Sequence, residues 1–185
     1  MQKGFTIIEV IVAIFILSVA VVGVFSAFSI IVILTSTASN RLTAAYLAQE
    51  GVETVRNIRD NNWLTRGQEP GERKWYEGLE PCFSACEVDY KTTGHDPNWT
   101  RSWVSDGAKL KIDLNGFYNY ENGTDTKFKR KIIIECPGSP SGLCADENND
   151  MMMVSVEVFW DEKPSILNSS GFGSIMVEET LYNWY

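Results

Sequence analysis

An apolar run near the N-terminus constrains this chain more than any other feature. It begins after Glu9 and continues to Leu34, and no charged side chain lies between Glu9 and Arg41. About 20 consecutive apolar residues are enough for a helix to cross a bilayer, and this run is longer. We therefore expect a membrane-spanning helix over residues 5–34.

Glu9 is the exception within this segment. A carboxylate inside a spanning helix costs about 2.5–3.5 kcal/mol on insertion scales, and such a residue is a functional hypothesis by default. Arg41 lies 32 residues away, which is about 48 Å along a helix. Cleavage after Gly4 would instead create an ammonium group on Phe5, one helical turn from Glu9 and equally accessible to Glu9 of a neighbouring chain. That ammonium group is the cation we expect Glu9 to pair with.

The segment from Lys3 to Glu9, with the apolar run behind it, resembles the processing site of type IV prepilins and type II secretion pseudopilins. The resemblance implies that a prepilin peptidase cuts between Gly4 and Phe5, which is the leader boundary 1–4, and that Phe5 is then N-methylated. It also implies that Glu9 pairs with Phe5 of an adjacent subunit as the helix enters a filament core. The implied partners are other pilin or pseudopilin subunits, the peptidase, an inner-membrane assembly platform and membrane lipid.

Two more common kinds of N-terminal apolar segment, a secretory signal and a single-pass membrane anchor, share part of this pattern. A secretory signal has a longer basic start, an apolar core of about 7–15 residues and a small-residue cleavage site, and none of these fits here. A simple single-pass anchor fits the length but leaves Glu9 unexplained. Lys3 predicts that the N-terminus is cytoplasmic and that the remainder of the chain lies outside. The resemblance implies an inner-membrane location before assembly and a cell-surface filament afterwards.

The helix is expected to continue beyond the membrane over residues 35–62. Apolar residues recur there at intervals of three and four, which predicts a buried stripe, and Asp60-Asn61-Asn62 is the expected stop. The stripe consists of Leu42, Ala45, Ala48, Val52, Val55 and Ile58. Unlike many major pilins, this helix contains no kinking proline, and Gly23 is its only weak point in the membrane.

The last part of the chain, residues 109–185, predicts a sheet. Alternating apolar residues favour strands, although Arg130 interrupts the apolar face of one of them, and Asn115-Gly116 and Asn122-Gly123 are turn signals. The expected strands are Lys109–Leu114, Lys127–Glu135, Met153–Trp160 and Ser174–Tyr182. The predicted fold class is α+β, a long helix packed on an antiparallel sheet in the manner of type IV pilins. Residues 63–108 show little periodicity and are expected to form an irregular loop.

Several later segments add to the resemblance. They are similar to minor pilins of the pilus-modification type and to J-type pseudopilins, although they are less specific than the processing site. These segments are Ala48 to Glu53, Val55 to Asp60, Asn115 to Tyr118, Phe128 to Ile134 and Leu181 to Trp184. They do not separate a pilus from a secretion system.

Four cysteines, Cys82, Cys86, Cys136 and Cys144, fall in the part placed outside the cytoplasm, where disulfides persist. Three pairings are possible, and the short separations favour Cys82 with Cys86 and Cys136 with Cys144. A four-cysteine zinc site is the alternative, but the spacings do not match paired CxxC motifs.

Other chemistry has little support in the sequence. The net charge of −8 argues against a direct nucleic-acid partner, and the single histidine, His95, with no catalytic motif, predicts neither an enzyme nor a cofactor. The best oxygen cluster for calcium contains Asp146, Glu147 and Asp150, with a second fragment at Asp113; a solvated turn explains each more simply.

The sequence thus predicts a structural filament subunit, more in keeping with a minor than a major pilin. The alternative is an uncleaved, single-pass adhesin or receptor that binds through an aromatic loop. Most of these aromatic residues fit a core position better than an exposed patch. They are Trp63, Trp75, Tyr76, Trp99 and Trp103.

Overall fold

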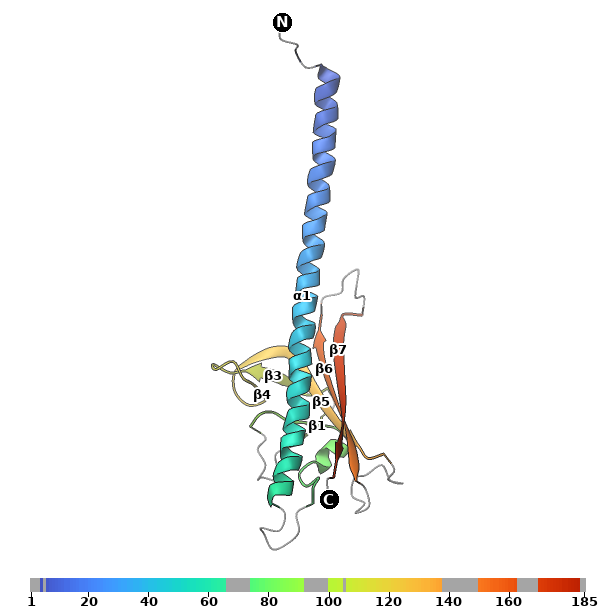
Figure 1. The fold of residues 1–185 in the computed structure, drawn as a ribbon. Coiled ribbons are helices and arrows are strands. Elements are labelled where there is room, and N and C mark those ends of the chain that lie inside the picture. The colour runs from blue at the N-terminus through green and yellow to red at the C-terminus, as the bar shows by residue number, and fades with distance from the viewer. Residues whose placement is uncertain are drawn as a thin grey trace. The chain divides into compact units, whose positions relative to one another are not determined.

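The computed structural model describes residues 4, 6–65, 74–91, 100–104, 106–137, 150–162 and 170–183. The chain divides into two units, Met1–Asn40 and Arg41–Tyr185, and each is described here by itself. One helix, α1 (Ile7–Thr65), provides the described helical part of the first unit and continues into the second (Figure 1). The predicted helix is confirmed, and it ends at Thr65 rather than at Asn62.

The first unit exposes nearly all of its side chains. Every residue from Ile7 to Ser36 is exposed, and α1 is the only described helix long and apolar enough to cross a membrane. The serine hydroxyls of this segment donate to carbonyls one turn earlier: Ser18 to Ile14 at 2.8 Å and Ser26 to Val22 at 3.0 Å. Such bonds satisfy hydroxyl groups without water, as an apolar environment requires.

The second unit contains an antiparallel sheet. Its long strands are β5 (Thr124–Glu135), β6 (Met151–Asp161) and β7 (Phe172–Tyr182), paired in that order. The far edge of β5 pairs with β3 (Lys109–Ile112) and with β1 (Cys86–Glu87). Outside these lie β4 (Tyr118–Asn119) and β2 (Arg101–Ser102). The α+β fold class is therefore confirmed; β5, β6 and β7 are longer than the sequence predicted, and β3 is shorter.

The expected irregular loop over residues 63–108 is partly wrong. Its described residues include β1, β2 and a 3-10 helix, η1 (Glu80–Phe83), besides the last turn of α1. Two-residue strands show no periodicity, because their place in the sheet is set by pairing with distant residues such as Ile132. Sequence patterns alone do not reveal such strands.

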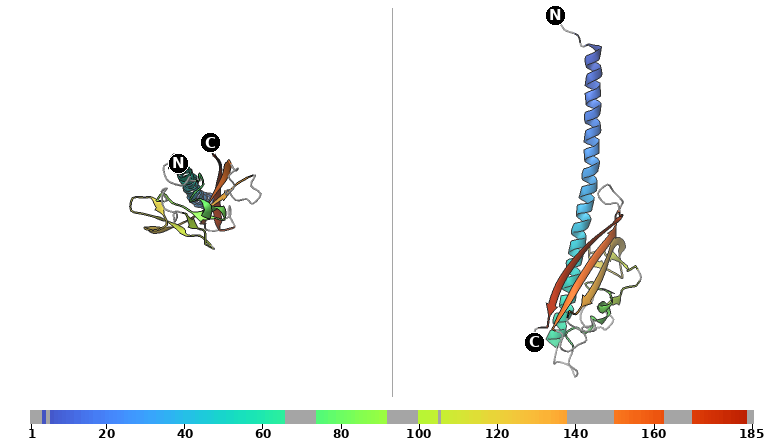
Figure 2. Two further views of the ribbon diagram at one scale, coloured as in Figure 1. Left: turned by 90° about the horizontal axis from the view of Figure 1, so that it is seen from below. Right: turned by 90° about the vertical axis from the view of Figure 1, so that its right-hand side faces the viewer.

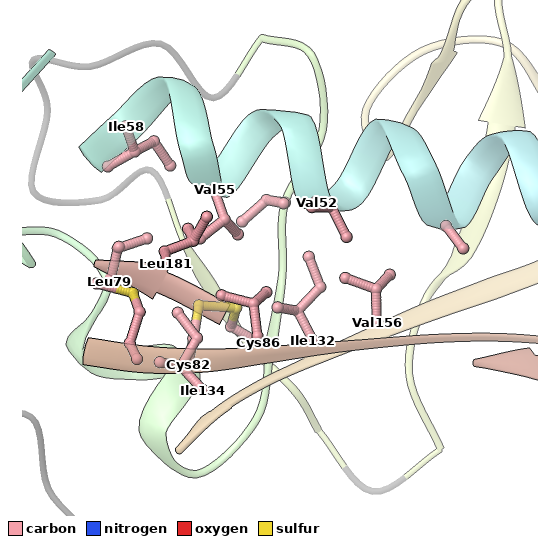
Figure 3. Packing of buried hydrophobic residues seen from close by; sticks show 14 of the residues in the cluster. Val52, Val55, Ile58, Leu79, Cys82, Cys86, Ile132, Ile134, Val156 and Leu181 are labelled. Atoms are coloured by element: carbon pink, nitrogen blue, oxygen red, sulfur yellow. A yellow bond between two sulfur atoms is a disulfide. The ribbon is translucent and has the colours of Figure 1, made fainter. Parts of the chain in front are cut away.

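One face of the sheet packs against the C-terminal part of α1 (Figure 3). Alternate residues of the strands are buried there, as the alternation predicted: Phe128, Arg130, Ile132 and Ile134 in β5, and Met152, Val154, Val156, Val158 and Trp160 in β6. Each buried leucine, isoleucine or valine contributes about 1.5–3 kcal/mol relative to an exposed one. This cluster is the core of the second unit.

The predicted helical stripe is confirmed at Ala48, Val52, Val55 and Ile58, but not at its N-terminal end. Leu42, expected to be buried, is 59 % exposed, and Ala45 is half-buried. The buried face of the helix also contains residues that the prediction omitted: Ala44, Leu47, Gly51, Arg59 and Asn62. Gly51 belongs to this face because a Cβ atom there would lie 2.9 Å from Val156 Cγ1, so glycine allows the helix to approach the sheet closely.

The predicted turns are present. Gly116 has φ of +87° and Gly123 has φ of +124°, a region that L side chains rarely adopt. A Cβ atom at Gly123 would also lie 2.2 Å from the carbonyl oxygen of Ile112. Glycine is therefore required at this hairpin for both conformational and steric reasons.

Candidate functional site

The candidate functional site is the start of α1. Thr6 directly precedes the helix, and its carbonyl accepts hydrogen bonds from the N–H groups of Glu9 at 3.1 Å and Val10 at 3.3 Å. Glu9 is therefore in the first helical turn, with its side chain exposed. Gly4 is exposed, and a Cβ atom there would meet nothing within 4 Å. Phe5 lies outside the described residues.

The helix itself offers Glu9 only partial compensation. A carboxylate in the first turn gains about 0.3–1 kcal/mol from the helix dipole, whereas burying it in a membrane costs about 2.5–3.5 kcal/mol. Among the described residues, Glu9 forms no ion pair within the chain. A buried Glu9 therefore requires a cation from another source.

Beyond Glu9, α1 presents apolar side chains on all sides. Phe15, Val22, Phe25 and Val32 are each more than 65 % exposed, and most other large apolar side chains between Glu9 and Leu34 are exposed as well. An exposed surface this apolar marks contact with lipid or with other proteins. The site therefore combines one carboxylate with a long apolar helix.

The N-terminal segment matches the sequence model of a known family. The prokaryotic N-terminal methylation motif matches residues 1–25, which include Gly4, Phe5 and Glu9. The chain carries the type IV prepilin signature. It also has one described helix that is long and apolar enough to cross a membrane, and its α+β architecture is like that of type IV pilins. No curated protein and no solved structure matches the chain.

The cysteine predictions are partly resolved. Cys82 and Cys86 form a disulfide, as predicted, and both are fully buried in the core, Cys82 within η1 and Cys86 at the start of β1 (Figure 3). Cys136 is also disulfide-bonded, and its expected partner, Cys144, lies outside the described residues. The Cys82–Cys86 bridge excludes a zinc site that would use all four cysteines as thiolates.

The calcium candidates are mostly outside the described residues. Asp146 and Glu147 lie outside the described residues, and Asp150 is exposed and directly precedes β6. In the part of the chain that the structure describes, no three acidic, histidine or cysteine residues form a group suited to a metal ion. Calcium binding at residues 146–150 remains a prediction.

The second calcium candidate, Asp113, has another role. One oxygen of its carboxylate accepts the N–H groups of Asn115 at 2.8 Å and Phe117 at 3.0 Å, and the other accepts the hydroxyl of Tyr90 at 3.3 Å. These bonds, chiefly that from Phe117 N–H, hold the pKa of Asp113 below its usual value. Asp113 thus closes the β3–β4 turn.

Most of the described aromatic candidates are core residues. Trp75 and Tyr76 are 7 % and 4 % exposed, and Trp63 packs against the core. Trp103 is half-buried, with its ring 5.5 Å from that of Phe159. Trp99 and His95 lie outside the described residues. The described residues therefore provide no exposed tryptophan patch for an adhesin.

Arg130 is the most important residue whose role the sequence did not reveal. It is fully buried, and its guanidinium donates to the carbonyl of Leu47 at 2.9 Å and to that of Val88. It also lies 3.5 Å from the carboxylate of Glu50. Arg130 thus joins α1, β5 and the segment after β1. The signal for this role was its position on the apolar face of a predicted strand.

Glu87 is a second buried charge. Its carboxylate accepts the N–H of Ala108 and lies 3.5 Å from Arg101, and its pKa is raised, mainly by burial. Nearby, burial also raises the pKa of Tyr120 to about 12, while its hydroxyl donates to the carbonyl of Arg130 at 3.4 Å. These groups hold loops in place around the sheet and show no catalytic arrangement.

Proposed function

We propose that this chain is a structural subunit of a type IV pilus or a type II secretion pseudopilus. A prepilin peptidase would cut it after Gly4, and the new N-terminus of Phe5 would be methylated. The subunit would then leave the inner membrane and enter a filament. The elaborate head, with its disulfides and long connections, is more in keeping with a minor than with the major subunit.

The observation that carries the proposal is Glu9 in the first turn of a long exposed apolar helix, inside a methylation motif. The helix dipole compensates this carboxylate only in part, so a cation must reach it in an apolar environment. Processing at Gly4 supplies that cation as the Phe5 ammonium group. An adjacent subunit would provide it, so charge pairing would set the register of one helix against the next.

The N-terminal segment also predicts how the chain is oriented in the membrane. Lys3 would keep the leader on the cytoplasmic side, where the peptidase and the assembly platform act, and the head would lie outside. Disulfides form in that compartment, which agrees with the Cys82–Cys86 bridge. The prepilin is thus a single-pass inner-membrane protein before assembly and part of a surface or periplasmic filament afterwards.

The deciding experiment is intact-mass and N-terminal peptide mass spectrometry on the chain isolated from its native membranes. We expect a chain that begins at Phe5 and carries one added methyl group. An intact Met1 terminus would instead favour the membrane-anchored adhesin. A terminus beyond Leu34 would remove the role given to Glu9.

A matched pair of variants separates processing from assembly. Gly4→Leu places a bulky side chain at the cleavage site and should leave the chain uncleaved in the membrane. Glu9→Gln should still be cleaved and methylated but should not enter filaments. Equal processing of wild type and Gly4→Leu would contradict the assigned cleavage site.

A further inference from the structure

Strand β7 has the one long unpaired edge in the described sheet. It pairs only with β6, whereas the other outer strands, β2 and β4, are two residues each. Its pairing with β6 continues from Met151–Tyr182 to Asp161–Phe172 without a register shift. Figures 1 and 2 show β7 at the outside of the sheet. Within the described residues, the outer edge of this eleven-residue strand is thus not paired with another strand.

The hydrogen bonds that flank β7 identify its outward-facing backbone groups. Asn183 N–H donates to the carbonyl of Asp150 at 2.7 Å, and Glu162 N–H donates to that of Gly171 at 2.9 Å. Bonded and non-bonded pairs alternate in an antiparallel ladder, so the odd-numbered residues of β7 bond to β6. The even-numbered residues point their N–H and C=O groups outward. Those in the middle of the strand are Ser174, Met176, Glu178 and Thr180, all with exposed side chains.

One contact confirms this assignment and marks where the open edge ends. Arg59 Nη1 of α1 donates to the carbonyl of Tyr182 at 3.1 Å, so that outward carbonyl is already satisfied. At the other end, Phe172 N–H donates to Ser170 Oγ at 3.5 Å. The open ladder therefore extends from Ser174 to Thr180.

This edge has little of the usual protection against strand pairing. Natural edge strands carry charged side chains, especially lysine, or proline, bulges and inward-pointing charges, which discourage a second strand. The charged residues of β7 are Glu178, on the exposed face, and Glu179. Phe172–Tyr182 contains neither lysine nor proline, and its register is regular. Its one charge on the helix-facing side, Glu179, is neutralised by an ion pair with Arg56. The edge is therefore suited to accept a strand.

We propose that β7 pairs with β7 of a second copy of this chain, antiparallel and centred on Val177. Ser174 then lies opposite Thr180, and Met176 lies opposite Glu178. On the other face, Ile175 lies opposite Glu179 and Val177 opposite itself. No like charges face each other, and every outward N–H and C=O group from Ser174 to Thr180 finds a partner.

Other registers are less suitable. A centre on Glu178 would place two Glu178 carboxylates directly opposite each other, which is destabilising. A centre on Met176 would bring Phe172 into the ladder, although its N–H already has an acceptor in Ser170. The strand is thus most self-complementary about Val177.

The pairing has a geometric consequence. A two-fold axis normal to the sheet reverses every direction in its plane, including that of α1 over residues 41–65, which lies against the sheet. The contact therefore joins heads whose helices run in opposite directions. Within the proposed filament role, it would link two antiparallel filaments laterally, but the pairing itself does not depend on that role.

The test uses the full chain with one copy in each lipid nanodisc, so that the membrane helices cannot associate. Light scattering should show a reversible doubling of particle mass as concentration rises. Val177→Cys should then form an intermolecular disulfide under mild oxidation, because its β carbon faces its own copy. Ile175→Cys, which faces Glu179, should not. Particles that stay single at the highest concentration, or a cross-link in the Ile175→Cys variant instead, would overturn the proposal.

A second pair of variants tests the backbone edge. Met176→Pro removes an outward N–H group without removing a bond to β6, so the fold should survive, as a circular dichroism spectrum would check. It should raise the dissociation constant of the dimer by about tenfold or more, since two symmetric hydrogen bonds are lost. Met176→Ala keeps the N–H group and should still pair. Undiminished pairing of the folded proline variant would exclude the β7 edge.

Discussion

The two halves of α1 share one backbone but are stabilised in different ways. From Ile7 to Ser36 every side chain is exposed, and hydroxyl groups such as those of Ser18 and Ser26 donate to the helix's own carbonyls. From Arg41 to Thr65 only one stripe is apolar, and the chain's own sheet buries it. The first half therefore needs lipid or other subunits to cover it, whereas the second half folds with the head.

This difference predicts which half each substitution affects. Changes in the first half should alter insertion or assembly and leave the stability of the head unchanged. Changes in the second half should alter the free energy of unfolding of the head. The variants below test that separation, starting with the largest expected effect.

Glu9→Gln should abolish entry into filaments, because it keeps the shape of the side chain but removes the charge that would pair with Phe5. Membrane insertion should be normal or better, since the buried charge costs about 2.5–3.5 kcal/mol. Filaments sheared from cells and probed for this chain give the measurement. Glu9→Asp, which retains the charge, should keep part of the wild-type incorporation. Full incorporation of Glu9→Gln would exclude pairing through this carboxylate.

Arg130→Ala should produce the largest loss of head stability, about 3–5 kcal/mol, because breaking a buried ionic contact leaves its partners unsatisfied. The partners are the carbonyl groups of Leu47 and Val88 and the carboxylate of Glu50. Urea unfolding followed by tryptophan fluorescence in detergent measures the change. Lys131→Ala, on the opposite face of β5, is the matched control and should cost less than about 1 kcal/mol. Equal losses would show that Arg130 is not a structural link.

Two glycines in the same helix give a direct comparison of its halves. A Cβ atom at Gly51 would lie 2.9 Å from Val156 Cγ1 and 3.1 Å from Arg130 Cδ, whereas at Gly23 nothing lies within 4 Å. Gly51→Leu should therefore destabilise the head by about 1–3 kcal/mol through overpacking. Gly23→Leu should leave the unfolding midpoint of the head unchanged. A loss of head stability in Gly23→Leu would contradict the separation of the two halves.

Sequence reasoning succeeded where a signal is local. The apolar run, the alternation in β5 and β6, the turn glycines Gly116 and Gly123, and the short Cys82–Cys86 loop each depend on neighbours in the chain. The signature at Gly4 and Glu9 was equally local, since its meaning does not depend on the fold of the head.

Sequence reasoning failed where distant segments determine which residues are buried and what they contact. Leu42 has the spacing of a buried residue, but the sheet covers the helix at a different angle, which Ala44, Leu47 and Gly51 define. The alternation in β5 places Arg130 on the buried face, but it does not show which groups Arg130 contacts, because these lie on α1 and after β1. Gly51 offered a signal, since a glycine inside a helical pattern often marks a close approach.

The smallest expected effect concerns the pH dependence of head stability. Burial raises the pKa of Glu87, whereas hydrogen bonds lower that of Asp113. The contribution of Glu87 is therefore fully present below its ordinary pKa and is lost as pH rises through the raised value. That of Asp113 is present above its ordinary pKa and is lost as pH falls through the lowered value. As pH rises, Glu87 should therefore lower the stability of the head, whereas Asp113 should raise it.

Glu87→Gln should therefore remove a decline in head stability between acidic and neutral pH, while its amide oxygen still accepts the N–H of Ala108. Asp113→Asn should remove a rise in stability over the acidic range instead. The Glu87 effect should be modest, because the Ala108 N–H and Arg101 oppose the effect of burial on its pKa. Urea midpoints of both variants across this pH range give the slopes, and the midpoint of Gly23→Leu should follow the wild-type curve throughout. If Glu87→Gln steepened the decline, burial would not be the dominant influence on that carboxyl group, and Arg101 would be the stronger one.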